Sequence, residues 1–319
     1  MHPYTSNPAE SVASLGELRL IELIRKWLGN ASPKSPAGIG DDCAVMAGSP
    51  RLQLVTVDPV IHGEHFDDNV PPHGVGEKLF KRNLSDIAAM GGRPRAAVVA
   101  LALDSHVSVA WLEGFYRGLA KVARKYHVPV IGGDIARHTG GLVATMTLVG
   151  ETVGPKALTR TGGRVGDWLY VTGSLGGSIL GYHWRFRPRL KEAAWLAKRP
   201  EVRALMDVSD GLAKDIQALT PRGARPVIET AKVPISRSAR TLARSTGRAP
   251  IDHALSDGED YELLFVVNGQ ADREGFEAAW RREFPLRLTC LGRFERPSSR
   301  PLQAGRVRLE DYHGYEHLR

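Results

Sequence analysis

The spacing of apolar residues near the start of the chain is that of an amphipathic helix. Apolar side chains recur every three or four residues from Leu18 to Leu28. Ser14 and Glu17 precede these residues with the S-x-x-E spacing of a capping box. In a capping box the two side chains accept hydrogen bonds from free N–H groups at the start of the helix. We therefore expect a helix over residues 15–28, ended by Gly29-Asn30.

The rest of the first half alternates between extended and helical patterns. Strict alternation and short apolar runs predict strands, whereas longer periodic runs predict helices. The expected strands cover residues 51–58, 96–103, 128–134 and 141–151, and the expected helices cover residues 75–92 and 108–127. The paired glycines Gly91 and Gly92 are expected to end the first of these helices.

The second half, from about Pro155, mixes the same two patterns. Strands are expected at residues 167–173, at the start of 204–219, and in RPVIET, ELLFVV and LRLTCLGRF. Helices are expected after a Gly-rich turn at residues 173–182, at the end of 204–219 and in DREGFEAAWRREF. Because both halves contain strands and helices, we expect an α/β (α+β) fold with two lobes, residues 1–153 and 154–319.

The charge of the chain raises the question of a nucleic-acid partner. The 319 residues are 42% hydrophobic and carry a formal net charge of +8. The cations are scattered apart from a concentration at residues 185–203, which we interpret first as a solvated helix face and second as a phosphate or partner surface. No zinc-finger spacing or RNP-type aromatic pattern is present. We expect no nucleic-acid partner, but a nucleotide- or nucleic-acid-binding module stays open as a non-enzymatic alternative.

The sequence also predicts the compartment. No apolar run approaches the roughly 18 residues needed to span a bilayer, and the first residues lack the plan of a signal peptide. Cys43 and Cys290 have no metal-ligand or redox spacing and fit a reducing compartment. We expect a cytoplasmic protein without a membrane partner.

Acidic residues stand at recurring places in this pattern. Six of them lie beside a glycine or at or beside a predicted strand end: Asp41, Asp42, Asp58, Asp134, Asp207 and Asp210. A seventh, Asp86, lies inside an apolar helical segment. Each one alone is readily explained as a cap or turn residue. Together they favour a common role, because ligand sites of α/β folds are built at strand ends.

Converging carboxylates need cations. Two of them 4 Å apart repel by roughly 4 kcal/mol at an effective dielectric constant near 20. Oxygen ligands without His or Cys suit Mg²⁺, which keeps open positions for phosphate oxygens. No P-loop or dinucleotide fingerprint occurs, so metal ions would have to stabilise most of the phosphate charge. The residues alone thus indicate metal-assisted phosphate chemistry.

Two local motifs agree with this chemistry. Asp207 and Asp210 flank Ser209, a candidate N-cap whose neighbouring helix N–H groups favour an anion. Gly132 and Gly133 would let the backbone approach a ligand closely before Asp134. For either motif alone, a capped helix or a tight turn is the simpler interpretation.

Several longer motifs resemble those of the thiamine-monophosphate kinase family, and they extend over nearly the whole chain, from about residue 16 to residue 318. GIGDD and NLSDIAAMG are shared with other enzymes of the same fold, whereas GEDYELLF and the terminal GYEH are particular to this family. The resemblance implies a two-lobed fold of the aminoimidazole-ribonucleotide-synthetase type, a homodimer formed through the N-terminal lobe, and ATP near the interlobe cleft. It also implies direct in-line transfer of the γ-phosphoryl group to thiamine monophosphate, with several Mg²⁺ ions and no phosphoenzyme or dedicated base.

The resemblance assigns residues by position. The implied metal ligands are Asp42, Thr56 through its hydroxyl, Asp58, Asp86, Asp134, Asp207 and the more peripheral Asp210. The implied ATP contacts are Gly133, Asp134, Arg160 and Ser209, and the implied thiamine-phosphate contacts are His65, Glu259 and Tyr315. Glu259 would face the cationic thiazolium or the aminopyrimidine, and Tyr315 would stack on a ring. Neighbours in an extended segment point opposite ways, so Asp42 is expected to face the metals and Asp41 to support the turn.

The chain also departs from the family pattern. The unusual residues are Val57, Ile135 and Ala136 in the first half, and Gly176-Gly177-Ser178 and Asp257 in the second. An active but divergent kinase is the first interpretation, and a relative with altered substrate or weakened activity is the second. Another ATP-dependent synthetase of the superfamily is disfavoured, because the chain lacks the N-terminal Cys loop and the C-terminal Cys tail of such relatives.

Overall fold

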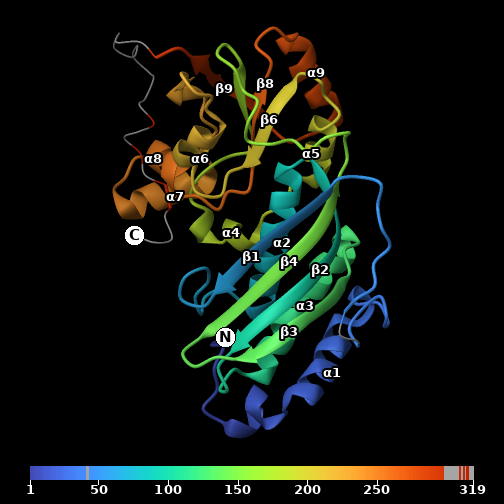
Figure 1. Cartoon of the computed structure of the whole chain (residues 1–319). Coiled ribbons are helices and arrows are strands. Elements are labelled where there is room, and N and C mark those ends of the chain that lie inside the picture. The colour runs from blue at the N-terminus through green and yellow to red at the C-terminus, as the bar shows by residue number, and fades with distance from the viewer. Residues whose placement is uncertain (41–42, 298–308, 310–311, 313, 316–319) are drawn as a thin grey trace. The chain divides into compact units, whose positions relative to one another are not determined.

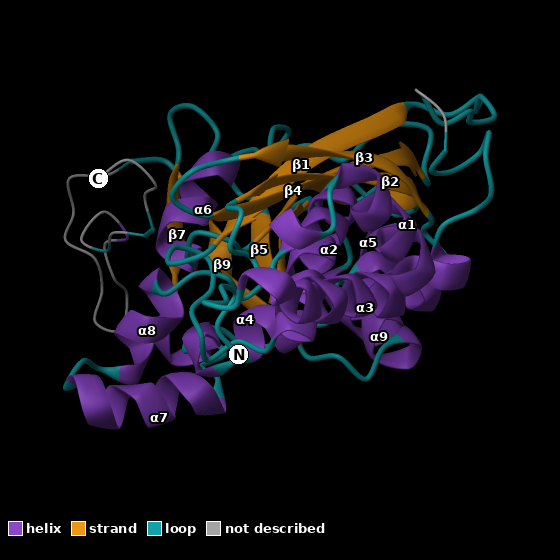
Figure 2. Ribbon diagram, turned by 90° about the horizontal axis from the view of Figure 1, so that it is seen from below, coloured by secondary structure: helices purple, strands orange, loops and turns teal. Residues whose placement is uncertain are grey.

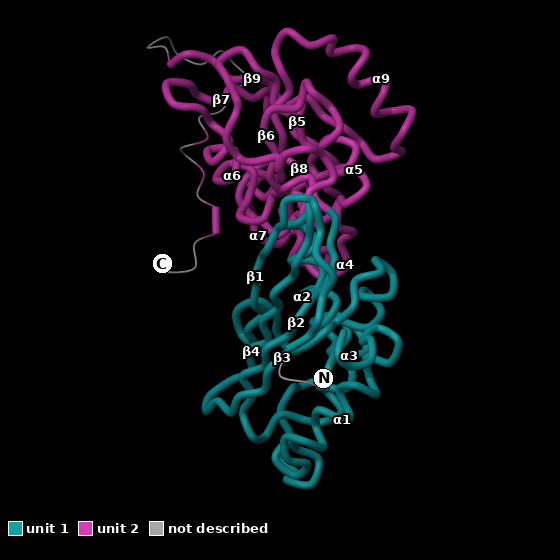
Figure 3. Tube along the Cα trace, turned by 45° about the vertical axis from the view of Figure 1, so that its right-hand side comes forward, with its two compact units in different colours: residues 1–87, 93–151 teal, residues 88–92, 152–319 magenta. Residues whose placement is uncertain are grey.

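The computed structural model describes residues 1–40, 43–297, 309, 312, 314 and 315. The chain (Figure 1) divides into two compact units, which Figure 3 colours separately. Unit 1 comprises residues 1–87 and 93–151, and unit 2 comprises residues 88–92 and 152–319. Each unit contains a sheet and helices, which confirms the mixed α/β class. Among the described residues, no helix has both the length and the apolar character needed to cross a membrane.

Unit 1 is built on a four-stranded sheet of order β1-β4-β2-β3. Its elements are α1 (Glu17–Leu28), β1 (Gln53–Ile61), α2 (Pro72–Ala89), β2 (Gly92–Leu103), α3 (Val109–Tyr126), β3 (Val130–Arg137) and β4 (Leu142–Thr152). β1 pairs antiparallel with β4, and β3 pairs parallel with β2. Helices α2 and α3 lie against one face of this sheet (Figure 2) and bury Phe80 and Phe115 completely.

Two expectations for unit 1 are wrong in their details. Ser14 does not cap α1: the N-cap is Gly16, and the Ser14 hydroxyl donates instead to the carbonyls of Ala9 and Ser11. The strands also continue past Asp58 and Asp134, because β1 pairs with β4 as far as Ile61 and β3 pairs with β2 as far as Arg137. These two acids therefore lie within strands and not at strand ends.

Unit 2 holds a five-stranded sheet of order β6-β8-β5-β9-β7, in which neighbouring strands pair antiparallel. Its strands are β5 (Trp168–Thr172), β6 (Val202–Asp207), β7 (Arg225–Ile228), β8 (Leu263–Val267) and β9 (Leu288–Glu295). Its helices are α4 (Tyr182–Arg185), α5 (Leu190–Leu196), α6 (Leu212–Leu219), α7 (Arg237–Thr246), α8 (Pro250–Ser256) and α9 (Arg273–Glu283). Successive residues of β8 enter two different cores: Leu264 packs with Ile216 of α6, and Phe265 packs with Trp280 of α9. Helices thus cover both faces of the sheet.

The basic segment at residues 185–203 is only in part the solvated face that its charge suggested: Arg185, Arg187, Lys191 and Lys198 are exposed, but other cations are not. The Arg189 side chain is buried and its guanidinium pairs with the Glu262 carboxylate. Arg203 donates at 2.9 Å to both carboxylate oxygens of Asp167, and the Arg199 guanidinium lies 4.0 Å from the centre of the Trp195 ring. Several cations of this segment therefore stabilise unit 2 internally.

Candidate active site

In unit 1, strand β1 and helix α2 bring predicted metal ligands together. The Thr56 hydroxyl of β1 donates a hydrogen bond to the Asp86 carboxylate of α2. Asp58 lies two residues further along β1 and so faces the same side of the sheet. The Arg82 guanidinium is 3.5 Å from the Asp58 carboxylate and donates to the Pro59 carbonyl at 2.8 Å. Thr56, Asp58 and Asp86 are half-buried, and the Arg82 guanidinium offsets part of the negative charge of the carboxylates.

These donors fit the chemistry of Mg²⁺, which prefers carboxylate and hydroxyl oxygens. Within the described residues, no three Asp, Glu, His or Cys side chains form a group that could hold one metal ion. Asp41 and Asp42 lie outside the described residues, and the expectations for them stay predictions. The donors of β1 and α2 are the hydrogen-bonded pair Thr56 and Asp86, with Asp58 on the same face of the sheet.

Asp134 lies on β3, at the opposite edge of the sheet from β1. With Gly133 it lines a cavity of about 630 Å³ between α1 and β3. Its lining is mixed: Leu18 and Ile21 of α1 and Tyr116 of α3 contribute apolar side chains, and Glu17 of α1 contributes a second carboxylate. A Cβ at Gly133 would lie 2.1 Å from the Val99 carbonyl oxygen, so only glycine allows β3 to pack here. A cavity that combines apolar side chains with carboxylates and a close-packed glycine has the character of a small-molecule site.

Sequence reasoning missed the helical wall of this cavity. Leu18 is 81% exposed although it belongs to the apolar pattern of α1, whose buried residues are Leu20, Ile24 and Leu28. A wide apolar stripe on α1 was visible in the sequence, but it was used only to predict a helix. Tyr116 gave no signal, because an aromatic residue at helical spacing is ordinarily a core residue.

His65 lies on the turn that follows β1, where a buried cation holds its backbone. The Lys78 ammonium donates to the His65 carbonyl at 2.6 Å, and Lys78 is fully buried in α2. A lysine within the apolar segment VGEKLF is the signal that sequence reasoning passed over. Lys78 therefore fixes the turn that carries a predicted substrate residue.

In unit 2, the loop of residues 208–211 joins several predicted residues. It follows Asp207, which is the last residue of β6 as expected. The Ser209 carbonyl accepts the Glu259 N–H at 2.7 Å, and the Asp210 carbonyl accepts the Tyr315 N–H at 3.0 Å. Predicted metal, ATP and thiamine-phosphate residues are thus brought together by backbone hydrogen bonds.

Ser209 is not the N-cap of α6. The N-cap is Gly211, and the N–H groups of Ser209 and Asp210 donate to the Asp215 carboxylate at 2.9 and 3.0 Å. These amides are therefore not open to a phosphate, contrary to the expectation from the motif. Burial raises the pKa of Asp215 to about 7, helped by the charges of Asp207 and Asp210 and opposed by the two amide hydrogen bonds.

The Glu259 backbone is held in an unusual conformation. Glu259 and Tyr261 have φ angles of +53° and +50°, in the left-handed region that residues with side chains rarely adopt. The Tyr261 hydroxyl donates to Glu259 at 3.2 Å, and the His183 ring nitrogen is 3.7 Å from the other carboxylate oxygen. Such strain persists where surrounding structure enforces it, most often at functional sites. The structure thus holds Glu259 in a fixed orientation.

Arg160 is a further predicted residue that the structure does not join to the others. It is exposed, and its side chain contacts none of the other predicted residues among those described. Its assignment to ATP stays a prediction.

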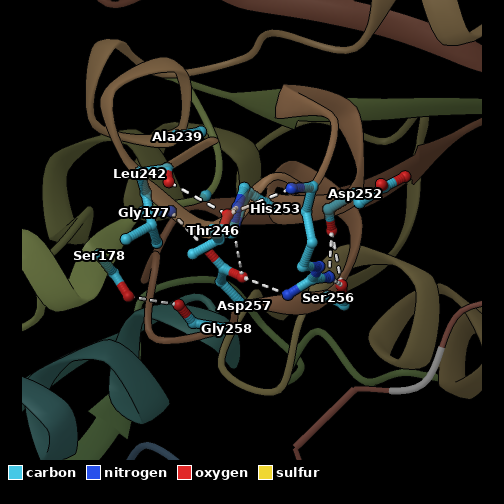
Figure 4. Close-up of polar contacts among 12 residues, drawn as sticks. Gly177, Ser178, Ala239, Leu242, Thr246, Asp252, His253, Ser256, Asp257 and Gly258 are labelled. Atoms are coloured by element: carbon cyan, nitrogen blue, oxygen red, sulfur yellow. Dashed lines mark hydrogen bonds and ion pairs between the residues drawn. The ribbon is translucent and has the colours of Figure 1, made fainter. Parts of the chain in front are cut away.

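The departures at Gly177 and Asp257 contact each other (Figure 4). The Asp257 carboxylate accepts the Gly177 N–H at 2.8 Å and lies 2.9 Å from a ring nitrogen of His253, which is buried. The Ser178 hydroxyl donates to the Gly258 carbonyl at 2.7 Å. The charge added by Asp257 is therefore used inside unit 2 to tie two loops together.

Known proteins resemble this chain in both sequence and fold. Residues 40–152 match the family model "AIR synthase related protein, N-terminal domain". The chain is 40% identical over 247 residues to the thiamine-monophosphate kinase of Rhodopirellula baltica, covering 74% of this chain and 77% of that protein. It is 31% identical to the structure of AaThiL complexed with AMPPCP and TMP, with a TM-score of 0.68 and coverage of 90% and 93%. A hydrogenase maturation protein HypE in complex with ATP shares the fold at 19% identity, with a TM-score of 0.71 over 88% and 87%.

Proposed function

The chain belongs to the thiamine-monophosphate kinase family, and on this premise we propose which residues and which metal perform its reaction. The enzyme uses ATP to phosphorylate thiamine monophosphate in thiamine biosynthesis. Its fold is that of the aminoimidazole-ribonucleotide-synthetase superfamily. The observation that carries the residue assignment is the loop of residues 208–211, which bonds Glu259 and Tyr315 through its carbonyls.

The acceptor of this reaction is itself a phosphate. It is already ionised, so the chain needs no general base and its task is to position two anions and offset their repulsion. We assign Ser209 and Arg160 to the ATP phosphates and Glu259 and Tyr315 to the thiamine rings. A guanidinium fork suits phosphate oxygens, and a carboxylate suits a cationic thiazolium.

Magnesium is the metal of this proposal. We assign several ions to the oxygen donors of each unit. In unit 1 these are Thr56, Asp58, Asp86 and Asp134, together with Asp42, and in unit 2 they are Asp207 and Asp210. Bound Mg²⁺ would supply the positive charge that lowers repulsion between the two phosphate groups. The Thr56–Asp86 hydrogen bond keeps two of the donors adjacent before any metal arrives.

The cavity of unit 1 supports a place for the nucleotide. Gly133 and Asp134 line it together with the apolar side chains of α1. Its volume of about 630 Å³ lies within the usual range of small-molecule sites. We assign the ATP base to the apolar wall and the phosphates to the end that carries Asp134.

A chelation experiment tests the metal and the reaction together. The protein is freed of divalent cations with EDTA and then assayed for thiamine diphosphate formed from thiamine monophosphate and ATP. We expect no product without metal, full recovery on adding Mg²⁺, and little recovery with Ca²⁺, which accepts a looser geometry. Product formation that is unchanged in EDTA would contradict the assignment of magnesium.

An open sheet face in unit 1 supports a homodimer. Val55 and Val57 of β1 are 68% and 59% exposed, on the face opposite to Thr56 and Asp58. Their partners in the register, Val149 and Thr147 of β4, extend the same face. Exposed apolar surface of this kind marks interaction sites, and a second copy of the sheet is the occupant that the family resemblance implies.

Replacing Val57 by aspartate tests the dimer. A charge on the apolar face would have to be buried without a partner, so we expect Val57→Asp to convert a dimer into a monomer. Light scattering after size-exclusion chromatography measures the mass. Val165→Asp changes a 45% exposed valine of unit 2 in the same way and should leave the dimer intact. A monomeric wild-type protein would contradict the proposal.

The cytoplasm is the proposed compartment. Cys43 and Cys290 are both free thiols, which is the usual state in a reducing environment. ATP, the co-substrate, is also used there.

A further inference from the structure

The loop of residues 208–211 is bonded on two sides by different parts of unit 2. Its carbonyls accept N–H groups from the segment that carries Glu259 and Tyr261, at 2.7 and 2.8 Å. The N–H groups of Ser209 and Asp210 donate to Asp215 in the first turn of α6. The loop therefore lies between the substrate segment and a helix.

A single atom receives both amides. Oδ2 of Asp215 accepts the N–H of Ser209 at 2.9 Å and the N–H of Asp210 at 3.0 Å. Asp215 is 5% exposed, so these hydrogen bonds compete with little water. If this acceptor were lost, two loop amides would lose their bonds, which is costly in a buried site.

The two amides belong to the same peptide groups as the two carbonyls. In the first group the Val208 carbonyl accepts from Tyr261 while the Ser209 N–H donates to Asp215. In the second group the Ser209 carbonyl accepts from Glu259 while the Asp210 N–H donates to Asp215. A peptide group is planar. The orientation that Asp215 imposes on each N–H is therefore transmitted to the carbonyl that holds the substrate segment.

We propose that Asp215 is a positioning residue for phosphoryl transfer, because it orients the two peptide groups that carry Ser209 and anchor Glu259. It links the nucleotide residues of unit 2 to the thiamine-phosphate residues without touching either substrate. This inference rests on the proposed assignment of Ser209 to ATP and of Glu259 to the thiamine ring.

Three substitutions separate hydrogen-bond geometry from charge. Asp215→Asn keeps an oxygen at the position of Oδ2 and removes the charge. Asp215→Glu keeps the charge and moves the oxygen by one methylene group, and Asp215→Ala removes the acceptor. For the Ala and Glu variants we expect kcat/KM to fall by about 10²-fold, because small misplacements of this size have such effects. KM should rise for both ATP and thiamine monophosphate, whereas the Asn variant should stay within a few-fold of wild type.

The two KM values distinguish positioning from simple loss of fold. A smaller folded fraction lowers the apparent kcat and leaves KM unchanged. Asp272→Ala is the matched control, since Asp272 accepts the Gly275 N–H at 3.0 Å in the first turn of α9 and has no bond to the loop. This control should lose some stability but keep both KM values.

Each outcome decides the inference. Unchanged KM values in the Ala variant, a rise for one substrate only, or an Asn variant as impaired as the Ala variant would overturn it. If the Ala variant does not fold, the comparison of Asn with Glu decides, and a Glu variant like wild type overturns the inference. A wild-type protein that forms no thiamine diphosphate would instead overturn the proposed function.

Discussion

Asp86→Asn is expected to lower the rate of thiamine diphosphate formation by about 10²–10⁴-fold, since a metal ligand of a phosphoryl-transfer site stabilises the transition state by several kcal/mol. The substitution keeps the size of the side chain. The Thr56 hydroxyl can still donate to the amide oxygen, so the hydrogen bond between β1 and α2 is retained. The loss of activity would therefore come from the lost charge.

The same substitution should leave stability unchanged or raised. Without metal, Asp86 adds negative charge on the side of β1 that also carries Asp58, and the asparagine removes that repulsion. The free energy of unfolding in urea, measured in EDTA, checks this. Asp68→Asn is the control, because Asp68 is an exposed acid of unit 1 that is assigned no ligand role. Full activity of the Asp86 variant would show that the metal ligands are misassigned.

Arg189→Ala is expected to cause the largest loss of stability, about 3–5 kcal/mol. The Arg189 guanidinium binds both oxygens of Glu262, and Glu262 is 1% exposed. Thr172 and Tyr182 also donate to this carboxylate, at 2.7 and 3.2 Å. These neutral donors cannot replace a full positive charge, so the substitution leaves a buried charge without its counter-ion.

Urea unfolding of unit 2, followed by tryptophan fluorescence, measures this loss. Adding Glu262→Gln to the Arg189 variant should recover much of the stability, because the double variant no longer buries a lone charge. Arg187→Ala removes an exposed cation two residues away and should change stability by less than about 0.5 kcal/mol. An Arg189 variant as stable as the Arg187 variant would contradict the buried ion pair.

The sequence predicted the elements whose pattern is local. Helices α1 and α3 follow from apolar periodicity, and Asp207 was placed correctly at the end of a strand. The lengths of β1 and β3 were underestimated, because they depend on pairing with β4 and β2 and not on their own residues. Helix α7 was missed, since its sequence RSARTLARST is mostly polar and contributes only Ala239 to the buried residues.

The candidate site was predictable in its residue types but not in its hydrogen bonds. The acids and glycines were recognisable from their motifs. The Ser209 amide donates to Asp215, six residues later, whereas the local N-cap rule treats the Ser209 hydroxyl as an acceptor for helix amides and does not predict this bond. Arg189 looked like part of a solvated face, because its partner Glu262 is 73 residues away in the sequence. Both errors come from contacts that only the folded chain creates.

The identity of the phosphoryl acceptor tests the central claim most directly. Purified protein is incubated with ATP, Mg²⁺ and either thiamine monophosphate or thiamine, and the thiamine phosphates and ADP are separated and quantified. We expect thiamine monophosphate to give thiamine diphosphate and ADP in equal amounts, and thiamine, which offers a hydroxyl and no phosphate, to give no product. Binding of ATP without any thiamine diphosphate, or phosphorylation of thiamine in place of its monophosphate, would contradict the account.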